Sequence, residues 1–272
     1  MPKFLRSLLA CSLLLITGLG ALPGANAQPT EPAYEKNWLV NGKDSLPYRL
    51  LLPQNFNPDS AYPLVLFLHG AGERGKDNEA QLIHGSKLFL NPDWRDRYPA
   101  IVVFPQCPKE GYWAPVQFEQ DSSGKRIFNF PAEAEPTPPM QMVLKLLQYL
   151  DKRFKLKPEQ QYVMGLSMGG MGTFDLVRRL PNRFAAAVPI CGGANPAIAP
   201  IIKNTAFWIF HGDKDDVVPP QCSKVMVDAI QRYYSAAEMQ FTLYPGVNHN
   251  SWDKAFAEPE LLPWLFSQRR KL

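Results

Sequence analysis

Short apolar runs recur along the chain and are separated by longer polar or amphipathic segments. Runs that are apolar throughout, rather than at every second position, are typical of strands buried on both faces of a parallel sheet. The runs predict strands at Trp38–Val40, Tyr48–Leu52, Leu64–Leu68, Ile101–Phe104, Gln161–Met164, Ala185–Ile190, Ala206–Phe210 and Met239–Tyr244. The first two form an opening pair around a turn at residues 41–44.

Helical periodicity appears between these runs. It is clearest where five apolar side chains fall on one face of a helix: Val143, Leu144, Leu147, Leu150 and Phe154. The pattern predicts helices at Asn78–Phe89, Met140–Phe154, Met171–Leu180, Ser223–Tyr234 and Pro259–Gln268. Alternating strands and helices imply an α/β fold with a doubly wound, mostly parallel sheet flanked by helices. In such a fold, ligands bind beyond the carboxyl ends of the strands.

The first 27 residues have the layout of a secretory signal peptide. Lys3 and Arg6 precede the apolar stretch Leu8–Leu19, and small residues follow up to Ala27. A membrane anchor is the alternative, but the apolar stretch is short for a bilayer of about 30 Å. We therefore expect cleavage after Ala27, a periplasmic or secreted protein, and no membrane association after cleavage. Residues 28–272 then form one α/β domain.

Charge and cysteine content narrow the possible partners. Loss of the leader lowers the formal net charge from +4 to +2, and no basic cluster predicts binding to nucleic acid or to an anionic membrane. Cys107, Cys191 and Cys222 remain, and this odd number leaves at least one thiol free. The sequence does not predict a pairing. It also contains no spacing of Cys, His and Asp that indicates a metal site.

The segment Gly165–Gly170 places a serine between a predicted strand and a predicted helix. A sharp turn in this position would expose the Ser167 hydroxyl as a nucleophile. Gly165 and Gly169 remove Cβ atoms that would collide in such a turn, and Gly170 lets the helix approach the sheet. A flexible Gly/Ser loop is the alternative, but it would not be expected between a strand and a helix.

Two later loops supply partners for the serine. Residues 211–219 follow an apolar strand and carry Asp213, Asp215 and Asp216, one of which would orient a catalytic histidine. Spacing alone does not choose between Asp215 and Asp216. His249 follows the last strand in a polar turn and is the candidate base, because an imidazole can take and return a proton at neutral pH.

The other histidines have less favourable settings. His84 lies on a polar predicted helix, and His211 opens the acidic loop as a structural hydrogen-bonding residue. His69 begins a glycine-rich loop, residues 69–75, after the first long apolar strand. This loop predicts half of an oxyanion hole, with the amides of Ala71 and Met168 as donors. A phosphate-binding loop is excluded because the Gly-Lys-Ser/Thr signature is missing.

Aromatic residues are frequent between Gln106 and Pro139, after another strand end. Two interpretations remain open: these side chains line the substrate pocket, or they form a satellite core under a long loop. Trp113 and Trp252 are the candidates for substrate contact.

Four segments together resemble an α/β-hydrolase: residues 68–75, 165–170, 211–219 and 249–252. They are similar to a group of secreted esterases, also described as predicted peptidases, that is related to polyhydroxybutyrate depolymerases, feruloyl esterases and dienelactone hydrolases. The resemblance implies that the acid is the fifth residue of a His-Gly-x-x-Asp-x-x-Val-Pro segment, which is Asp215. It also implies a cofactor-free cycle in which Ser167 forms an acyl-enzyme and His249 activates water.

The expected substrate is therefore a small-molecule or carbohydrate-linked ester. Two alternatives use the same fold: a serine peptidase of the prolyl oligopeptidase-like type, and a non-catalytic binding module. A peptidase of that type would be expected to carry a further gating domain, which a chain of 272 residues does not accommodate. All three triad candidates are present, which disfavours the binding module.

Overall fold

The computed structural model describes residues 33–122, 124, 126–234 and 238–270, so the expected signal peptide lies outside the described residues. The main feature is an eight-stranded sheet in the order β1-β2-β4-β3-β7-β8-β9-β10. Its strands are β1 (Glu35–Asn41), β2 (Asp44–Leu51), β3 (Tyr62–Leu68), β4 (Ile101–Pro105), β7 (Leu156–Leu166), β8 (Ala186–Ile190), β9 (Ala206–Gly212) and β10 (Met239–Tyr244). The strands β4, β3, β7, β8, β9 and β10 pair in parallel along this order, whereas β2 is antiparallel to both of its neighbours, β1 and β4. This confirms the predicted doubly wound, mostly parallel sheet.

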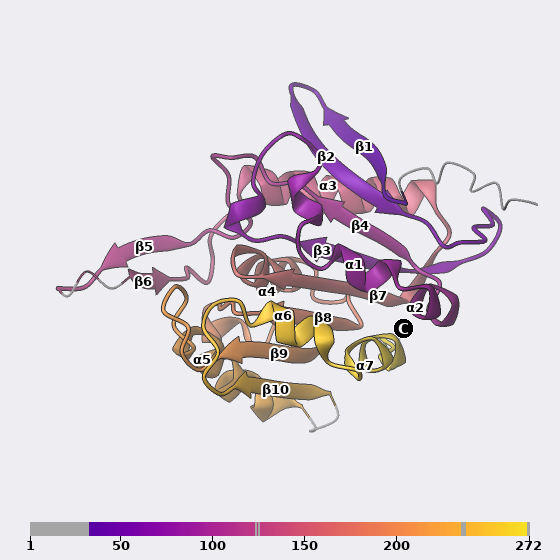
Figure 1. Ribbon diagram of the computed structural model, residues 1–272. Helices are drawn as coiled ribbons and strands as arrows, with labels where there is room; N and C mark the ends of the chain where they lie inside the picture. The colour runs from indigo at the N-terminus through magenta and orange to yellow at the C-terminus, as the bar shows by residue number, and fades with distance from the viewer. Residues whose placement is uncertain (1–32, 123, 125, 235–237, 271–272) are drawn as a thin grey trace, which may run out of the picture. The chain divides into compact units, whose positions relative to one another are not determined.

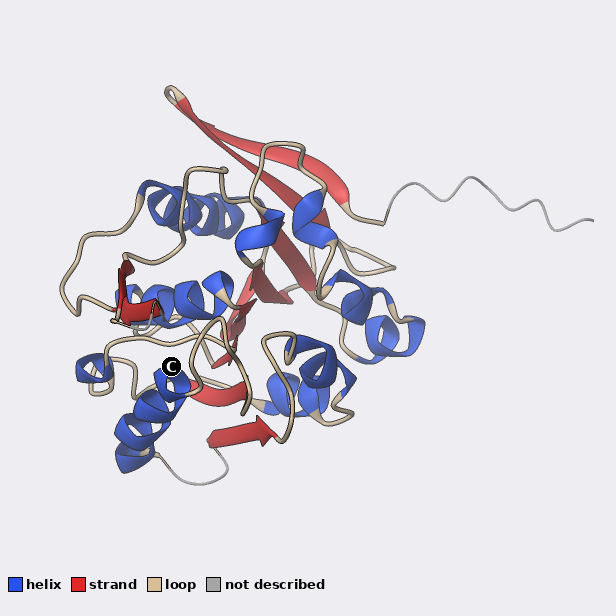
Figure 2. Ribbon diagram, turned by 60° about the vertical axis from the view of Figure 1, so that its left-hand side comes forward, coloured by secondary structure: helices blue, strands red, loops and turns tan. Residues whose placement is uncertain are grey.

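Helices cover both faces of this sheet (Figures 1 and 2). The α-helices are α1 (Ser86–Leu90), α2 (Pro92–Arg97), α3 (Pro138–Arg153), α4 (Met168–Arg179), α5 (Gln221–Ile230), α6 (Trp252–Ala257) and α7 (Leu261–Ser267). Short 3₁₀ helices are η1 (Ala71–Glu73), η2 (Ala80–Leu82), η3 (Pro196–Ile198) and η4 (Gln231–Tyr233). No helix in the described part of the chain is both long and apolar enough to span a bilayer.

The period of two along β3 divides the core into two layers. Leu64, Leu66 and Leu68 pack in one buried cluster with apolar side chains of α3, α4 and α5. Val65 and Phe67 point to the other face and pack with side chains of α1, α6 and α7. Because both faces are covered, these strands are apolar throughout. Each fully buried leucine contributes roughly 1.5–3 kcal/mol to folding.

Helix α3 shows how the sequence pattern produces this packing. The hydroxyl of Thr137 accepts a hydrogen bond from the Met140 amide at 3.2 Å and caps the helix, whose first two residues are prolines. Val143, Leu147 and Leu150 are buried on the face toward the sheet. The predicted helix Met140–Phe154 is therefore confirmed with small shifts at both ends.

The predicted helix Asn78–Phe89 is wrong. The segment contains only η2 and the start of α1, separated by Gly85 in the left-handed region at φ 80°. Asn78 also has a positive φ of 56°, and the Asp77 carboxylate accepts hydrogen bonds from the Glu79 and Ala80 amides at 2.6 and 2.8 Å. Local side-chain to backbone bonds thus replace the helical pattern.

Four other elements were not in the expected set. The predicted helix Pro259–Gln268 is confirmed as α7, but α6 before it was not expected, and neither was α2. The aromatic stretch contains an antiparallel hairpin of β5 (Gln117–Gln120) and β6 (Arg126–Asn129), which forms a separate two-stranded sheet (Figure 1). Its strands are mostly exposed and too short to give a clear sequence pattern.

Candidate active site

Ser167 lies between the end of β7 and the first residue of α4. It is one of the non-glycine residues with a positive φ, at φ 53° and ψ −116°. Such a conformation costs on the order of 1–3 kcal/mol and persists only where the surroundings enforce it. The Ser167 amide donates to the carbonyl of Ile190 at 2.8 Å, which holds the turn against the next strand.

Glycine at three positions makes this turn possible. A Cβ atom on Gly165 would collide with the Gly169 carbonyl, and one on Gly169 would collide with the Leu68 carbonyl at the end of β3. A Cβ on Gly170 would lie 2.6 Å from the Ile190 carbonyl oxygen. Helix α4 therefore approaches β3 and β8 closely enough to fix the serine at the edge of the sheet.

Ser167, His249 and Asp215 lie in one hydrogen-bonded line. His249 Nε2 is 2.9 Å from Ser167 Oγ, and His249 Nδ1 is 2.8 Å from Asp215 Oδ2. Because the carboxylate can only accept, Nδ1 donates to it and Nε2 is left to accept the serine proton. The three residues follow the carboxyl ends of β7, β10 and β9, so side chains far apart in sequence meet at one edge.

Asp215 is buried, and four groups donate to its carboxylate. Oδ1 accepts from the amides of Val217 and Val218 at 3.0 and 2.8 Å, while Oδ2 faces His249 and His211 Nε2, the latter at 3.2 Å. Burial alone would raise the pKa of Asp215. The hydrogen bonds from His211, His249 and the Val218 amide outweigh it and hold that pKa well below the usual value.

The neighbouring Asp216 is exposed to solvent. Its amide donates to the Asn248 side chain at 3.1 Å, and the same Asn248 oxygen accepts from the His249 amide at 2.7 Å. Asn248 thus connects the acidic loop to the turn that carries His249. Of the two aspartates that spacing left open, the structure brings Asp215 against the histidine.

His211 was expected to be a structural hydrogen-bonding residue, and its contacts confirm this. It is fully buried, its Nδ1 lies 2.7 Å from Ser223 Oγ, and its Nε2 lies 2.9 Å from the Val218 carbonyl oxygen. The Val218 oxygen and Asp215 Oδ2 are both acceptors, so Nε2 carries a proton. His211 therefore holds the acidic loop and the Asp215 carboxylate in place through contacts made from the protein interior.

The two expected oxyanion-hole residues each begin a helix. Ala71 is the first residue of η1 and Met168 is the first residue of α4, where backbone amides have no partner within the helix. Gly70 brings the first loop close to the serine, since a Cβ on Gly70 would lie 3.7 Å from Ser167 Cβ.

His69 fixes the start of this loop from inside the core. Its Nε2 accepts from the Cys107 amide at 2.9 Å, and its Nδ1 lies 2.6 Å from the Gly70 carbonyl oxygen. Burial lowers the pKa of His69 to about 4, so it is a neutral imidazole with a defined tautomer at pH 7.

Trp113 is fully buried beside His69, contrary to the expectation of substrate contact. Its indole N–H donates to the His69 carbonyl oxygen at 3.0 Å, and its side chain packs in the main core. Trp252, the other candidate, is half-buried and lies edge-on to His249 with ring centroids 5.3 Å apart.

Other aromatic residues of the same stretch form a satellite cluster. Tyr112, Phe128 and Phe130 pack around Ala114, Met171 and Val218. This arrangement matches the second of the two interpretations left open by the sequence.

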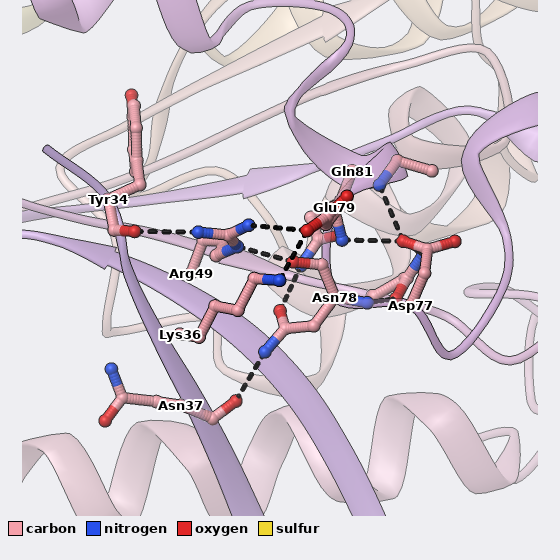
Figure 3. A network of polar contacts seen from close by, with 10 residues as sticks. Tyr34, Lys36, Asn37, Arg49, Asp77, Asn78, Glu79 and Gln81 are labelled. Carbon is pink, nitrogen blue, oxygen red and sulfur yellow. Dashed lines mark hydrogen bonds and ion pairs between the residues drawn. The ribbon is translucent and has the colours of Figure 1, made fainter. Parts of the chain in front are cut away.

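The segment around Asn78, which follows the glycine-rich loop at residues 69–75, is held by a polar network (Figure 3). Arg49 of β2 donates to the carbonyl oxygens of Asn78 and, at 2.8 Å, of Tyr34. The Asn78 amide donates to the buried Gln106 side chain at 2.7 Å, and the Asn78 side chain donates to the Asn37 carbonyl at 3.0 Å. The opening β1–β2 pair therefore braces the loop that carries Ala71.

One set of possible metal ligands occurs among the described residues. Single ligand atoms of Cys191, Asp215 and His249 lie within 4.8 Å of one another. Burial raises the pKa of the Cys191 thiol, and a metal requires the thiolate. Asp215 and His249 are already hydrogen-bonded to each other, so this set fits proton transfer better than metal binding. Cys107, Cys191 and Cys222 are all free thiols.

The chain is similar to known esterases both in its family and in its fold. Residues 43–255 match the model of the Esterase family, described as "Putative esterase". The chain is 25% identical over 170 residues to a bifunctional acetylxylan esterase/xylanase of Neocallimastix patriciarum, a match that covers 61% of this chain and 21% of that protein.

Solved structures agree with the family match. A thermostable esterase is 33% identical, with a TM-score of 0.77, and the match covers 88% of this chain and 64% of that one. A feruloyl esterase module from Clostridium thermocellum, solved with sinapinate, is 15% identical with a TM-score of 0.63 over 88% and 89% of the two chains. The fold is that of the α/β-hydrolases. This chain spans about a fifth of the curated relative and under two thirds of the thermostable esterase.

Proposed function

Because the chain belongs to the Esterase family, we propose that it hydrolyses carboxylic esters with Ser167 as nucleophile, His249 as general base and Asp215 as the acid that orients it. The observation that carries this proposal is the unbroken line from Ser167 Oγ through His249 to Asp215, with contacts of 2.9 and 2.8 Å. A serine hydroxyl is a weak nucleophile at neutral pH, and a histidine placed to take its proton allows it to attack an acyl carbon.

The first half of the cycle forms an acyl-enzyme. Ser167 Oγ bonds to the acyl carbon while its proton passes to His249 Nε2, and the carbonyl oxygen becomes an oxyanion. The C–O bond to the alcohol then breaks, and His249 returns the proton to the departing alkoxide. In the second half, water loses a proton to His249 and attacks the acyl carbon. The bond from that carbon to Ser167 Oγ then breaks, His249 returns the proton to Oγ, and the carboxylic acid leaves.

Two charges develop in this scheme and both are stabilised: the negative charge of the oxyanion and the positive charge of the His249 imidazolium. The amides of Ala71 and Met168 would donate to the oxyanion, and loss of one such donor typically costs about 2.7–4 kcal/mol. Asp215 stays ionised, because its donors lower its pKa, and it stabilises the imidazolium that forms on His249. No cofactor takes part in any step.

The proposed substrates are small-molecule or carbohydrate-linked esters, in line with the acetylxylan esterase and feruloyl esterase relatives. Trp252 beside His249 is a proposed substrate contact. We also propose that residues 1–27 direct export, so that residues 28–272 act as one domain in the periplasm or outside the cell.

An ester panel with the Ser167→Ala variant tests this function. Wild type should hydrolyse p-nitrophenyl acetate and should form a fluorophosphonate adduct that mass spectrometry maps to Ser167. The variant should lose at least about 10⁴-fold in turnover and form no adduct. Ser60→Ala, at an exposed serine in a loop, is the matched control and should leave both readouts unchanged. Turnover of alanine anilides without ester turnover would overturn the proposal in favour of a peptidase.

A further inference from the structure

A chain of short polar contacts runs from Asp215 into the core. Asp215 Oδ2 lies 3.2 Å from His211 Nε2, and Nδ1 of the same ring lies 2.7 Å from Ser223 Oγ on α5. Ser223 Oγ in turn donates to the Gly192 carbonyl oxygen at 2.9 Å. His211 and Ser223 are fully buried, so bulk water supplies neither of them with a partner.

The same chain connects the acid to the serine turn. Gly192 lies two residues after Ile190, whose carbonyl oxygen accepts from the Ser167 amide at 2.8 Å. A Cβ on Gly192 would lie 2.6 Å from the backbone of Gly170 in α4, so the two segments are in close contact. The polar chain therefore ends on the backbone that positions the nucleophile.

The number of hydrogens in this chain follows from the groups at its two ends. The Gly192 carbonyl oxygen can only accept, so the single hydrogen of the Ser223 hydroxyl lies on the line between the two oxygens. The Ser223 oxygen then accepts from His211 Nδ1. At the other end, Nε2 faces the Val218 carbonyl oxygen at 2.9 Å and the Asp215 carboxylate, which can also only accept. Both ring nitrogens therefore face acceptors, and each needs a hydrogen.

A neutral His211 ring would leave one contact of the chain unmade. With a hydrogen on Nε2 alone, Nδ1 would take the Ser223 hydrogen, and the serine and Gly192 oxygens would face each other at 2.9 Å as two acceptors. A buried acceptor without its donor costs about 1–3 kcal/mol. An imidazolium satisfies every atom of the chain, and the Asp215 carboxylate supplies the counter-charge that a buried cation requires.

The titratable groups around Asp215 leave it available as that counter-charge. Burial opposes ionisation of Asp215, but the hydrogen bonds from His211 and His249 hold its pKa well below the usual value. Burial raises the pKa of the nearby Cys191 and Cys222 thiols, so both are neutral at pH 7. One negative charge is thus shared between two imidazole rings.

We propose that His211 is a doubly protonated positioning residue of the triad, held in this form by Ser223 and sharing the Asp215 carboxylate with His249. A positive charge on one side of the carboxylate weakens its attraction for a second one, so His249 releases its proton more readily and remains a base at lower pH. His211 itself takes no part in proton transfer. The effect on catalysis rests on the proposed esterase function, whereas the protonation of His211 does not.

Ring ¹⁵N NMR of the full chain labelled at its four histidines tests the protonation directly. A solvent-accessible histidine is mostly neutral at pH 7.5, so we expect one ring with hydrogens on both nitrogens. His211→Gln should remove that signal, and Ser223→Ala, which removes the acceptor of Nδ1, should convert it to a ring with one hydrogen. A wild-type spectrum in which every ring carries a single hydrogen overturns the proposal, whether or not the variants fold. Persistence of the doubly protonated ring in either variant also overturns it.

The pH dependence of kcat/KM on p-nitrophenyl acetate tests the effect on the triad. In Ser223→Ala the acid limb should move to higher pH by about 0.5–1 unit, because His249 no longer shares the carboxylate with a second cation. At high pH the variant should converge with wild type, since the triad residues are unchanged. An equal loss at every pH would make the chain of contacts merely structural and would contradict the proposal.

A second buried serine provides the matched control. The Ser86 hydroxyl also donates to a backbone carbonyl, that of Leu82, and Ser86→Ala should leave both the His211 signal and the acid limb unchanged. Thermal denaturation shows whether each variant folds. If wild type neither hydrolyses the ester nor forms a fluorophosphonate adduct, the esterase proposal fails, and the NMR spectra still decide whether His211 is doubly protonated.

Discussion

Two segments near Ser167 share a local sequence and differ in how their acid is hydrogen-bonded. After β3 the chain reads His69-Gly70-Ala71-Gly72-Glu73, and from the last two residues of β9 it reads His211-Gly212-Asp213-Lys214-Asp215. Each segment has a buried histidine at or just after the end of a strand, and a buried acid lies four residues later. Asp215 is surrounded by donors, whereas Oε2 of Glu73 has none in the described part of the chain.

The histidines account for this difference. His211 turns toward the acid of its own loop and lies 3.2 Å from Asp215 Oδ2. His69 instead bonds the Gly70 carbonyl and the Cys107 amide, so it holds the backbone of its loop and leaves Glu73 uncompensated. The same spacing thus gives an acid surrounded by donors in one segment and a buried acid whose Oε2 has no hydrogen-bond partner among the described residues in the other.

The largest expected effect is a loss of kcat/KM when Asp215 is replaced. Asp215→Asn should lower kcat/KM on p-nitrophenyl acetate by about 10⁴-fold, because an amide in this position favours the wrong tautomer of His249. Asp216→Asn is the matched variant, and it should change kcat/KM less than about threefold because Asp216 is exposed. Steady-state kinetics on both variants check this. A large loss in Asp216→Asn with little loss in Asp215→Asn would reverse the assignment.

The triad residues show which parts of the site could be predicted from the sequence. Ser167 and His249 were predictable because each follows a recognisable strand, and glycines mark the serine turn. Spacing alone did not separate the adjacent Asp215 and Asp216, whereas the family resemblance implied Asp215, which is the residue that lies against His249.

The burial of Glu73 was not predicted from the sequence. The repeated His-Gly-x-x-acid spacing was the one local signal that could have drawn attention to it. Trp113 was misassigned because an aromatic residue in a long loop gives no sign of its burial.

Lowering the pH should reveal the contribution of His69 to stability. The pKa of His69 is about 4 in the folded chain against an ordinary 6.5, so below pH 6.5 the unfolded chain binds a proton that the folded chain does not. Stability is therefore highest above pH 6.5 and falls as the pH drops toward 4. This one group should remove about 2 kcal/mol of unfolding free energy by pH 5.

Urea denaturation at pH 7.5 and pH 5 measures this loss. His69→Gln does not titrate in this range, although its amide can still accept from Cys107. The variant should be less stable than wild type at pH 7.5, and its stability should fall less between the two pH values. An equal fall in both proteins would show that His69 is not the group responsible. Effects of the second loop, including Asp215, are present in both proteins and cancel.

The smallest expected effect compares the stability contributions of the two acids. Asp215→Asn removes a charge that several donors stabilise, and it should lower the unfolding free energy by about 2 kcal/mol. Glu73→Gln replaces an uncompensated buried charge with a neutral amide of the same size, so at pH 8 it should be neutral or stabilising by up to about 1 kcal/mol. Urea denaturation of both variants measures the two changes side by side. Opposite signs are expected because only the Asp215 carboxylate has several donors that compensate its charge, and a marked loss of stability in Glu73→Gln would instead make Glu73 a structural acid like Asp215.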